Sequence, residues 1–181
     1  KEYSTANFIF KDGHPYRVGA LARFNNNHGN LSSRAKALVK KSHLKLPSHN
    51  PFLNNLAQAI EIVHCIDHSL ALLNELPLES EKPPHFKDIH IEPGHGIAAI
   101  EVPRGTLWHE YSIDKDGIIT YANIVTPTVQ NLQPMEDDIR AIVPQLLHLR
   151  KEKIVLEIEK LIRSYDPCFS CSTHFLKVKW L

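Results

Sequence analysis

The sequence predicts an α+β fold in which helices pack with a small antiparallel sheet. Three observations favour this class. Residues 51–76 and 152–164 repeat apolar side chains at helical spacing. Between these stretches, residues 97–125 form apolar runs around a turn-forming Asp-Lys-Asp-Gly segment, a pattern typical of paired antiparallel strands. The length of 181 residues suits a single domain that can bury a sizeable core.

The N-terminal part should hold two helices after an irregular start. We expect loops and short extended pieces over residues 1–30, which end in a polar, turn-prone stretch. A serine pair after Leu31 offers an N-cap for a helix through about His43. The helix over residues 51–76 begins at a proline suited to a first turn. It carries one apolar stripe, made of Leu53, Leu56, Ile60, Val63, Leu70 and Leu73.

The C-terminal part should alternate from linker to sheet to helices. Residues 79–84 form a solvated linker, and Gly117 provides the positive φ of a turn between two strands. The last helix should bury Ile154, Leu156, Ile158, Leu161 and Ile162. The expected strands cover residues 97–102, 106–113 and 118–125, and the expected helices cover 135–149 and 152–164.

Composition and charge exclude several classes of function. The 21 Lys and Arg residues against 20 Asp and Glu residues leave a net charge of +1, too little to attract nucleic acid or an anionic membrane surface. Neither a run of about 18 apolar residues nor a secretory signal is present, so we expect a cytoplasmic protein without a membrane span. Because the chain starts at Lys1 and its one methionine is Met135, we expect a fragment of a longer chain or a processed start.

The strongest chemical signal lies in residues 166–174, Asp-Pro-Cys-Phe-Ser-Cys-Ser-Thr-His. Two thiols three residues apart can converge on one soft or borderline metal, and Pro167 helps to set the turn between them. A metal site completed by ligands from elsewhere is favoured. A small zinc module using Cys168, Cys171 and His174, a redox pair, and two buried thiols without metal stay open. Cys65, in the middle of a helix, is expected to be buried and inert.

Two other clusters could contribute polar groups to a site. Arg104 stands between a proline and a glycine at a corner between strands, where its guanidinium suits a small anion or a carboxylate; a plain surface arginine is the alternative. Residues 126–131, Thr-Pro-Thr-Val-Gln-Asn, place hydroxyl and amide groups in what we expect to be a fixed loop, or else in ordinary turn chemistry.

A third cluster lies on one helix face. Glu61, His64 and His68 could form a metal site, although a solvated face with a charge pair is the more common arrangement. His90, His95 and His109 lack a spacing that indicates metal ligands.

Together these motifs resemble the large, catalytic subunit of nickel–iron hydrogenases. The ending Asp-Pro-Cys-x-x-Cys-x-x-His matches residues 166–174, and Glu-x-Pro-Arg-Gly matches residues 101–105. Residues 122–131 and 15–23 resemble further stretches of this family in the right order. The sequence of residues 106–131 looks most similar to that of the soluble, cytoplasmic, NAD(P)-linked or sulfur-reducing members. The resemblance implies the C-terminal half of a hydrogenase large-subunit fold and reversible heterolytic cleavage of dihydrogen.

The family roles fall on particular positions of this chain. The resemblance implies that Cys168 is a terminal nickel ligand and proton acceptor, and that Cys171 bridges nickel and an iron that carries CO and CN ligands. It implies a magnesium ion held by His174 and by a backbone carbonyl near Ile124. The cyanide pocket would be formed by Pro103, Arg104 and Thr128, and Asp166 would pair with Arg104. Such donors are needed because buried anionic ligands without hydrogen bonds are costly.

The chain also departs from the family pattern. Large subunits carry a second Cys-x-x-Cys motif and a carboxylate near the N-terminus, and neither is found in this sequence. We therefore expect a C-terminal fragment, inactive alone, with residues 175–181 as an extension that a maturation endopeptidase could remove. The resemblance implies an iron–sulfur small subunit and diaphorase or ferredoxin-type subunits as partners. A non-catalytic interaction subunit that keeps the fold without the metal centre is the alternative.

Overall fold

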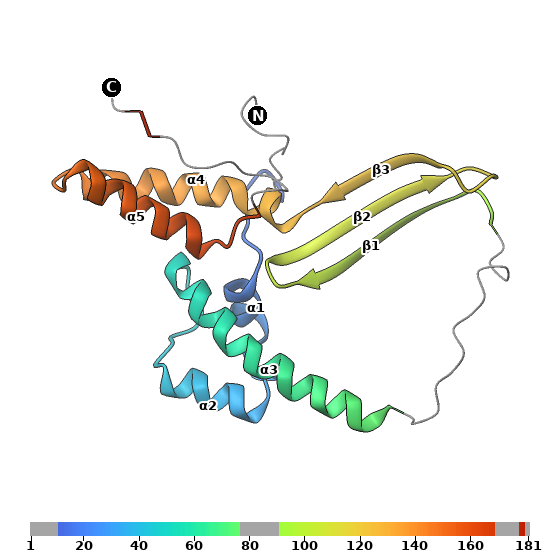
Figure 1. Cartoon of the computed structure of the whole chain (residues 1–181), viewed down its shortest axis with the longest axis horizontal. Coiled ribbons are helices and arrows are strands. Elements are labelled where there is room, and N and C mark those ends of the chain that lie inside the picture. Colours follow the sequence, from blue (N-terminus) through green and yellow to red (C-terminus); the bar gives the residue numbers. More distant parts are fainter. Residues whose placement is uncertain (1–10, 77–90, 169–177, 180–181) are drawn as a thin grey trace.

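The structure is a computed structural model that describes residues 11–76, 91–168 and 178–179. Over these residues the fold is α+β, as predicted (Figure 1). The α-helices are α1 (Ala20–Asn27), α2 (Ser33–Lys41), α3 (Asn54–Glu75), α4 (Pro127–Leu146) and α5 (Lys151–Ser164). Short 3₁₀ turns occupy His28–Asn30 and Pro51–Leu53, and the strands are β1 (Gly94–Val102), β2 (Gly105–Ile113) and β3 (Ile119–Val125).

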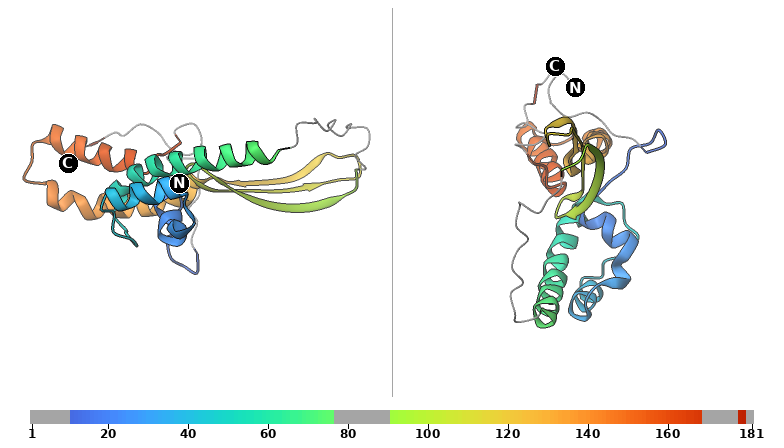
Figure 2. Two further views of the ribbon diagram at one scale, coloured as in Figure 1. Left: turned by 90° about the horizontal axis from the view of Figure 1, so that it is seen from below. Right: turned by 90° about the vertical axis from the view of Figure 1, so that its right-hand side faces the viewer.

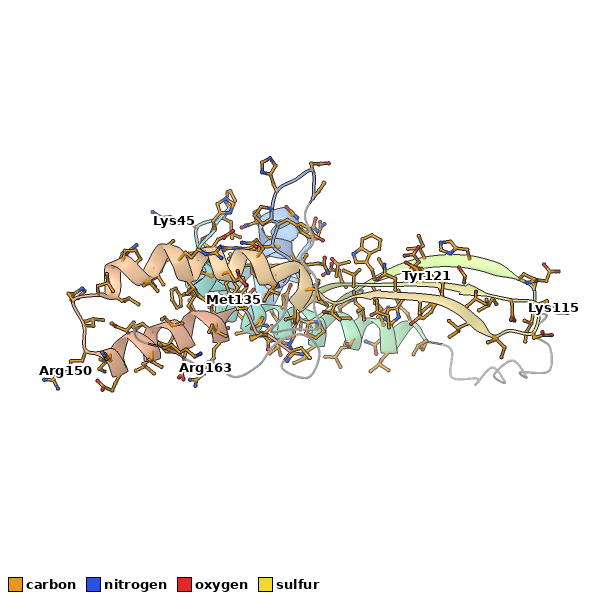
Figure 3. All side chains as sticks on the ribbon, turned by 90° about the horizontal axis from the view of Figure 1, so that it is seen from above. Lys45, Lys115, Tyr121, Met135, Arg150 and Arg163 are labelled. Carbon is orange, nitrogen blue, oxygen red and sulfur yellow. The ribbon has the colours of Figure 1, made fainter. Side chains whose placement is uncertain are left out.

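The three strands form an antiparallel sheet in the order β1-β2-β3. Trp108 of β2 pairs with Ala99 on one side and with Val125 on the other. The sheet extends as a long arm away from α4 and α5 (Figures 1 and 2), with Lys115 at its far tip (Figure 3). Gly117 adopts φ +76° in this distal turn, as the sequence predicts. The opposite end of the sheet, where β1 turns into β2, therefore lies against the helices.

In the described part of the chain, two separate apolar clusters hold the helices together. One joins α4 to α5 through Leu132, Met135, Leu161 and Tyr165, and Figure 3 shows Met135 on the side of α4 that faces α5. The other joins α1, α2 and α3 and comprises Ala20, Phe24, Ala35, Ala57 and Ile60. The predicted buried face of α5 is confirmed at Ile154, Ile158 and Leu161, while Leu156 and Ile162 are half-buried.

The expectation of loops throughout residues 1–30 is wrong for α1. This helix begins after Gly19, which adopts φ +110°, and buries Ala20, Leu21 and Phe24. Its eight residues end in three consecutive asparagines, which have poor helix propensity. The remaining apolar face is too short to predict a helix from the sequence. Packing against α3, rather than local propensity, stabilises this helix.

The expectation of a loop over residues 126–131 is also wrong. These residues form the start of α4, which begins eight residues before the predicted position of 135 and ends at Leu146 instead of 149. Thr126 is the N-cap and accepts a hydrogen bond from the amide of Val129, and Pro127 occupies the first turn, where its missing N–H costs nothing. Pro134 lies inside the helix, which explains why the sequence pattern suggested a later start.

Helix α3 is confirmed in position but not in its burial. Its N-terminal half packs in the α1–α2–α3 cluster, whereas Leu70 and Leu73 are 53% and 64% exposed. Cys65 is exposed, so the expectation that it is buried is wrong. Among the described residues, Pro51–Glu75 is the one helix long and apolar enough to cross a membrane by length and composition. It carries Glu61 and Asp67 in ion pairs with Arg23 and Arg34, an arrangement that fits a helix packed against protein.

Several expectations fall outside the described residues. They concern the linker over residues 79–84, His90, Cys171, His174 and most of the tail over residues 175–181.

Candidate functional site

The corner between β1 and β2 places Arg104 beside Gly19, which precedes α1, and Asp166, which follows α5. Gly105 opens β2 with φ +137°, and a Cβ at this position would lie 2.4 Å from Cγ2 of Val18. On the other side of the corner, a Cβ at Gly19 would lie 3.1 Å from the carbonyl oxygen of Arg104. These two glycines let the segment before α1 approach the strand corner closely. The backbone of Arg104 is therefore fixed by sterics as well as by the turn.

The side chain of Arg104 contacts Asp166 in two ways. Its Nε donates to the backbone carbonyl of Asp166 at 2.8 Å, and its Nη2 lies 3.1 Å from Oδ1 of the same residue. The two side chains are 44% and 32% exposed. The strand corner and the segment that follows α5 are thus joined by a partly exposed, two-point contact between an arginine and one residue.

The segment from Asp166 to Cys168 is held by further hydrogen bonds. Asp166 adopts φ +51°, and its Oδ2 accepts a bond from Nε2 of Gln58 on α3 at 3.1 Å. The backbone amide of Cys168 donates to Oγ1 of Thr128 at 3.1 Å. Thr128 is buried in the first turn of α4, and accepting this bond uses a hydroxyl lone pair rather than its hydrogen. The backbone that presents Cys168 is therefore fixed from both α3 and α4.

A second arginine, Arg23 on α1, contacts the corner residues that precede Arg104. Its Nε and Nη2 donate to both carboxylate oxygens of Glu61, each at 2.7 Å. Its Nη1 donates to Glu101 at 2.7 Å and to the carbonyl of Val102 at 3.1 Å, and Nη2 also donates to the carbonyl of Pro103 at 3.0 Å. Although burial alone would lower the pKa of Arg23, the two carboxylates raise it above its ordinary value. All five guanidinium hydrogens have acceptors.

The start of α4 fixes the remaining neighbours of the corner. Gln130 is buried and donates to the carbonyls of Thr106 and Thr126, at 2.6 and 3.1 Å. Asn131 makes a paired contact with the backbone of Val18, accepting from its amide at 2.9 Å and donating to its carbonyl at 3.2 Å. Around the site, side-chain amides therefore provide hydrogen bonds to backbone groups that regular secondary structure would otherwise provide.

A cavity of about 500 Å³ adjoins this region, and Arg17, Asp138 and Tyr165 are among the residues that line it. The hydroxyl of Tyr165 donates to Oδ2 of Asp138 at 2.6 Å, and Arg17 pairs with the same oxygen at 2.5 Å. The Arg17 guanidinium carbon lies 5.4 Å from the centre of the Tyr165 ring. Burial first, and then the hydrogen bond to Asp138, raises the pKa of Tyr165 well above its ordinary value.

The structure brings together five of the residues that the sequence singled out. Arg104 contacts Asp166, Thr128 contacts Cys168, and Pro103 directly precedes Arg104 in the strand corner. The five residues come from three separate stretches of the chain. Ile124 lies on β3, where it pairs with His109 in the sheet register. No described contact joins Ile124 to the other five, and its expected companion His174 lies outside the described residues. The roles of all these residues at a metal centre stay predictions.

The cluster on the face of α3 has other roles. Glu61 binds Arg23, and His64 accepts a hydrogen bond from the amide of Ser32 at 3.1 Å through Nδ1. The rings of His64 and His68 stack with their centres 6.0 Å apart. Within residues 11–76, 91–168 and 178–179, no group of three or more His, Cys, Asp or Glu side chains is arranged to hold a metal ion.

Sequence reasoning missed Arg23 and Gln58 as parts of the site. Arg23 belongs to the stretch over residues 15–23 that carries one of the family resemblances, which was the available signal. Gln58 lies three residues before Glu61 on α3, so the two share a helix face, but nothing in the sequence indicates their partners.

The chain is similar in sequence to known hydrogenases. The nickel-dependent hydrogenase family matches residues 3–174. Sulfhydrogenase 1 subunit alpha of Pyrococcus furiosus is 36% identical over 177 residues, which cover 98% of this chain and 41% of that protein. The NAD-reducing hydrogenase HoxS subunit beta of Cupriavidus necator is 36% identical over 166 residues, covering 88% of this chain and 34% of that protein. The chain thus spans about two fifths or less of the length of these relatives.

Solved structures show the same fold. A NAD⁺-reducing [NiFe]-hydrogenase in the H₂-reduced state superimposes with a TM-score of 0.70 at 30% identity, covering 91% of this chain and 37% of that one. The Ni-Fe-Se hydrogenase of D. vulgaris Hildenborough gives a TM-score of 0.65 at 21% identity and supports the fold alone.

Proposed function

This chain belongs to the nickel-dependent hydrogenase family, and we propose that it supplies the C-terminal part of the catalytic subunit of a [NiFe] hydrogenase. The reaction is the reversible conversion of dihydrogen into protons and electrons. The chain spans 41% of one relative's length, so the active enzyme needs further polypeptide. The observation that carries the proposal is the contact of Arg104 in the Glu-x-Pro-Arg-Gly motif with Asp166 in the Asp-Pro-Cys motif, 62 positions apart.

The donor set fits the metals that the family name implies. Thiolates suit soft or borderline metals such as nickel. Cys168 and Cys171 would supply two thiolate ligands. His174 and the carbonyl near Ile124 would hold a magnesium ion. When bound, a nickel–iron pair with CO and CN ligands supplies the Lewis acidity that polarises dihydrogen.

The side chains around Cys168 have distinct tasks in this proposal. The family resemblance implies that Sγ of Cys168 would accept the proton when dihydrogen is split. Arg104 and Thr128 offer hydrogen bonds to anionic ligands beside the metals, and Asp166 orients the Arg104 guanidinium. Pro103 would line this pocket without adding a competing donor. Arg104 and Thr128 would thus satisfy the hydrogen bonds of anionic ligands, which are costly to bury without donors.

The assembly and location of the enzyme are also proposals. We infer an iron–sulfur small subunit that carries electrons away, followed by diaphorase or ferredoxin-type subunits. One named relative and one solved structure of NAD-reducing enzymes support this. A cytoplasmic location and a maturation endopeptidase acting on residues 175–181 complete the proposal. Large exposed apolar side chains on α3 and on the sheet, among them Leu73, Ile100 and Ile124, fit a chain covered by other polypeptide.

The test uses the complete enzyme that contains this chain, purified from its host. We expect stoichiometric nickel by elemental analysis and dihydrogen-dependent dye reduction. Cys168→Ser should lose both, while Cys65→Ser, which changes an exposed cysteine on α3, should keep both. An enzyme without nickel or dye reduction would contradict the proposal and favour the non-catalytic interaction subunit. Stoichiometric zinc in place of nickel would favour the small zinc module.

A further inference from the structure

One side chain, that of Arg23 on α1, binds the strand corner that carries Arg104. The guanidinium of Arg23 bonds three consecutive residues of this corner: the carboxylate of Glu101 and the carbonyls of Val102 and Pro103. Arg104 follows directly. The Arg23 side chain is 23% exposed and has every hydrogen engaged, so it has little freedom to move.

Arg23 is itself held by α3. Glu61 faces Arg23 in a bidentate pair and is 17% exposed. One helical turn earlier on α3, Gln58 holds Oδ2 of Asp166 at 3.1 Å. The same helix face therefore fixes both partners of the Arg104–Asp166 contact, Asp166 directly and Arg104 through Arg23.

We infer that Arg23, anchored by Glu61, is a positioning residue that sets where the Arg104 guanidinium lies relative to Asp166 and Cys168. The inference rests on the proposed function for its catalytic consequence. Its geometric basis is that a planar fork with five donors can hold two carboxylates and two carbonyls at once, which a lysine ammonium with three donors cannot do. Retaining the positive charge at this position is therefore not sufficient.

The test compares Arg23→Lys with the unchanged enzyme in the complete, nickel-loaded form. We expect kcat to fall by about tenfold to a hundredfold with little change in KM, since a small displacement near reacting groups has effects of that order. The infrared bands of the iron-bound cyanides should shift, because Arg104 would donate from a different position. Nickel content should be unchanged.

Arg34→Lys is the matched control. Arg34 also reaches α3, where Nη1 lies 3.1 Å from Asp67, but it is 70% exposed and has no described contact with the strand corner. This variant should keep the kcat and the cyanide bands of the unchanged enzyme. An Arg23→Lys enzyme with a lower melting temperature but unshifted bands and unchanged kcat would overturn the inference and leave Arg23 a structural role.

A second variant covers the case in which Arg23→Lys does not assemble. Glu101→Gln alters one acceptor of Arg23 at a side chain that is 49% exposed, so it should fold. A smaller shift of the cyanide bands in the same direction is expected, and unchanged bands would overturn the inference. Failure of the proposed function is seen separately, as the absence of nickel and dihydrogen oxidation in the unchanged enzyme.

Discussion

Arg104 reaches Asp166 with two different nitrogen atoms, one to the backbone carbonyl and one to the carboxylate, at 2.8 and 3.1 Å. A lysine at position 104 keeps the charge but cannot make both contacts with the same geometry. We expect Arg104→Lys to lower dihydrogen turnover by about a hundredfold while nickel content is retained, the order of effect seen when one fixed donor is removed from a reaction centre.

Arg140→Lys serves as the control for that substitution. Arg140 also pairs with carboxylates, Glu136 and Asp137, but it is a 63% exposed residue on α4. Its replacement should change activity little, because exposed pairs of this kind contribute little to stability. An Arg104→Lys enzyme as active as the Arg140→Lys enzyme would contradict the role given to Arg104.

Thr128 is expected to stabilise the backbone at Cys168. Thr128→Val keeps the shape of the side chain but removes the acceptor for the Cys168 amide, leaving that donor unsatisfied. We expect the free energy of unfolding to fall by about 1–3 kcal/mol, with a matching loss of nickel during chelator treatment. Thr128→Ser, which keeps the hydroxyl, should retain most of both quantities. Equal behaviour of the two variants would show that the bond does not matter.

The sequence predicts the fold class, the sheet and most helices of this chain because their hydrophobic patterns are local. It also identifies Arg104, Asp166 and Cys168 as site residues, because the motifs that contain them are short and distinctive. The contact between Arg104 and Asp166 was expected from family resemblance, whereas physical reasoning from the sequence alone favours a plain surface arginine.

The rest could not be predicted because it depends on contacts between distant parts of the chain. The spacing of Glu61 and His64 on the helix is the same whether Glu61 binds a metal or an arginine. Glu61 binds Arg23 because α1 packs next to α3, and the sequence does not reveal that packing. Asn131 looks like a loop residue in the sequence, yet it lies on α4 and bonds the backbone of Val18. Such amide-to-backbone bonds leave no periodic signal.

Gly105 should be sensitive to the smallest side chain. An alanine there would combine an unfavourable φ of +137° with a Cβ 2.4 Å from Cγ2 of Val18. Adding the costs of backbone strain and overpacking, we expect Gly105→Ala to lower the free energy of unfolding by about 2–6 kcal/mol. In β1, Gly96 has no atom within 4 Å of an added Cβ, so Gly96→Ala should change stability by less than about 1 kcal/mol. Denaturant unfolding of the two variants compares them directly.

Tyr165 gives a prediction about alkaline pH. Burial and the bond to Asp138 raise the pKa of its phenol in the folded protein, whereas the unfolded chain releases this proton near pH 10. The folded state then binds more protons than the unfolded state above pH 10, so its stability falls as pH rises, by up to about 1.4 kcal/mol per pH unit from this group. Below pH 10 the contribution is fully present.

Removing the phenol should remove this pH dependence. We expect the difference in unfolding free energy between the unchanged protein and Tyr165→Phe to be constant from pH 7 to 9 and to shrink between pH 10 and 11. Tyr121→Phe is the matched control, because it removes the same hydroxyl from a side chain that is 49% exposed on the sheet. Absorbance at the tyrosinate band provides an independent check. If Tyr165 ionised together with the exposed tyrosines, the buried hydrogen bond to Asp138 would not control its proton.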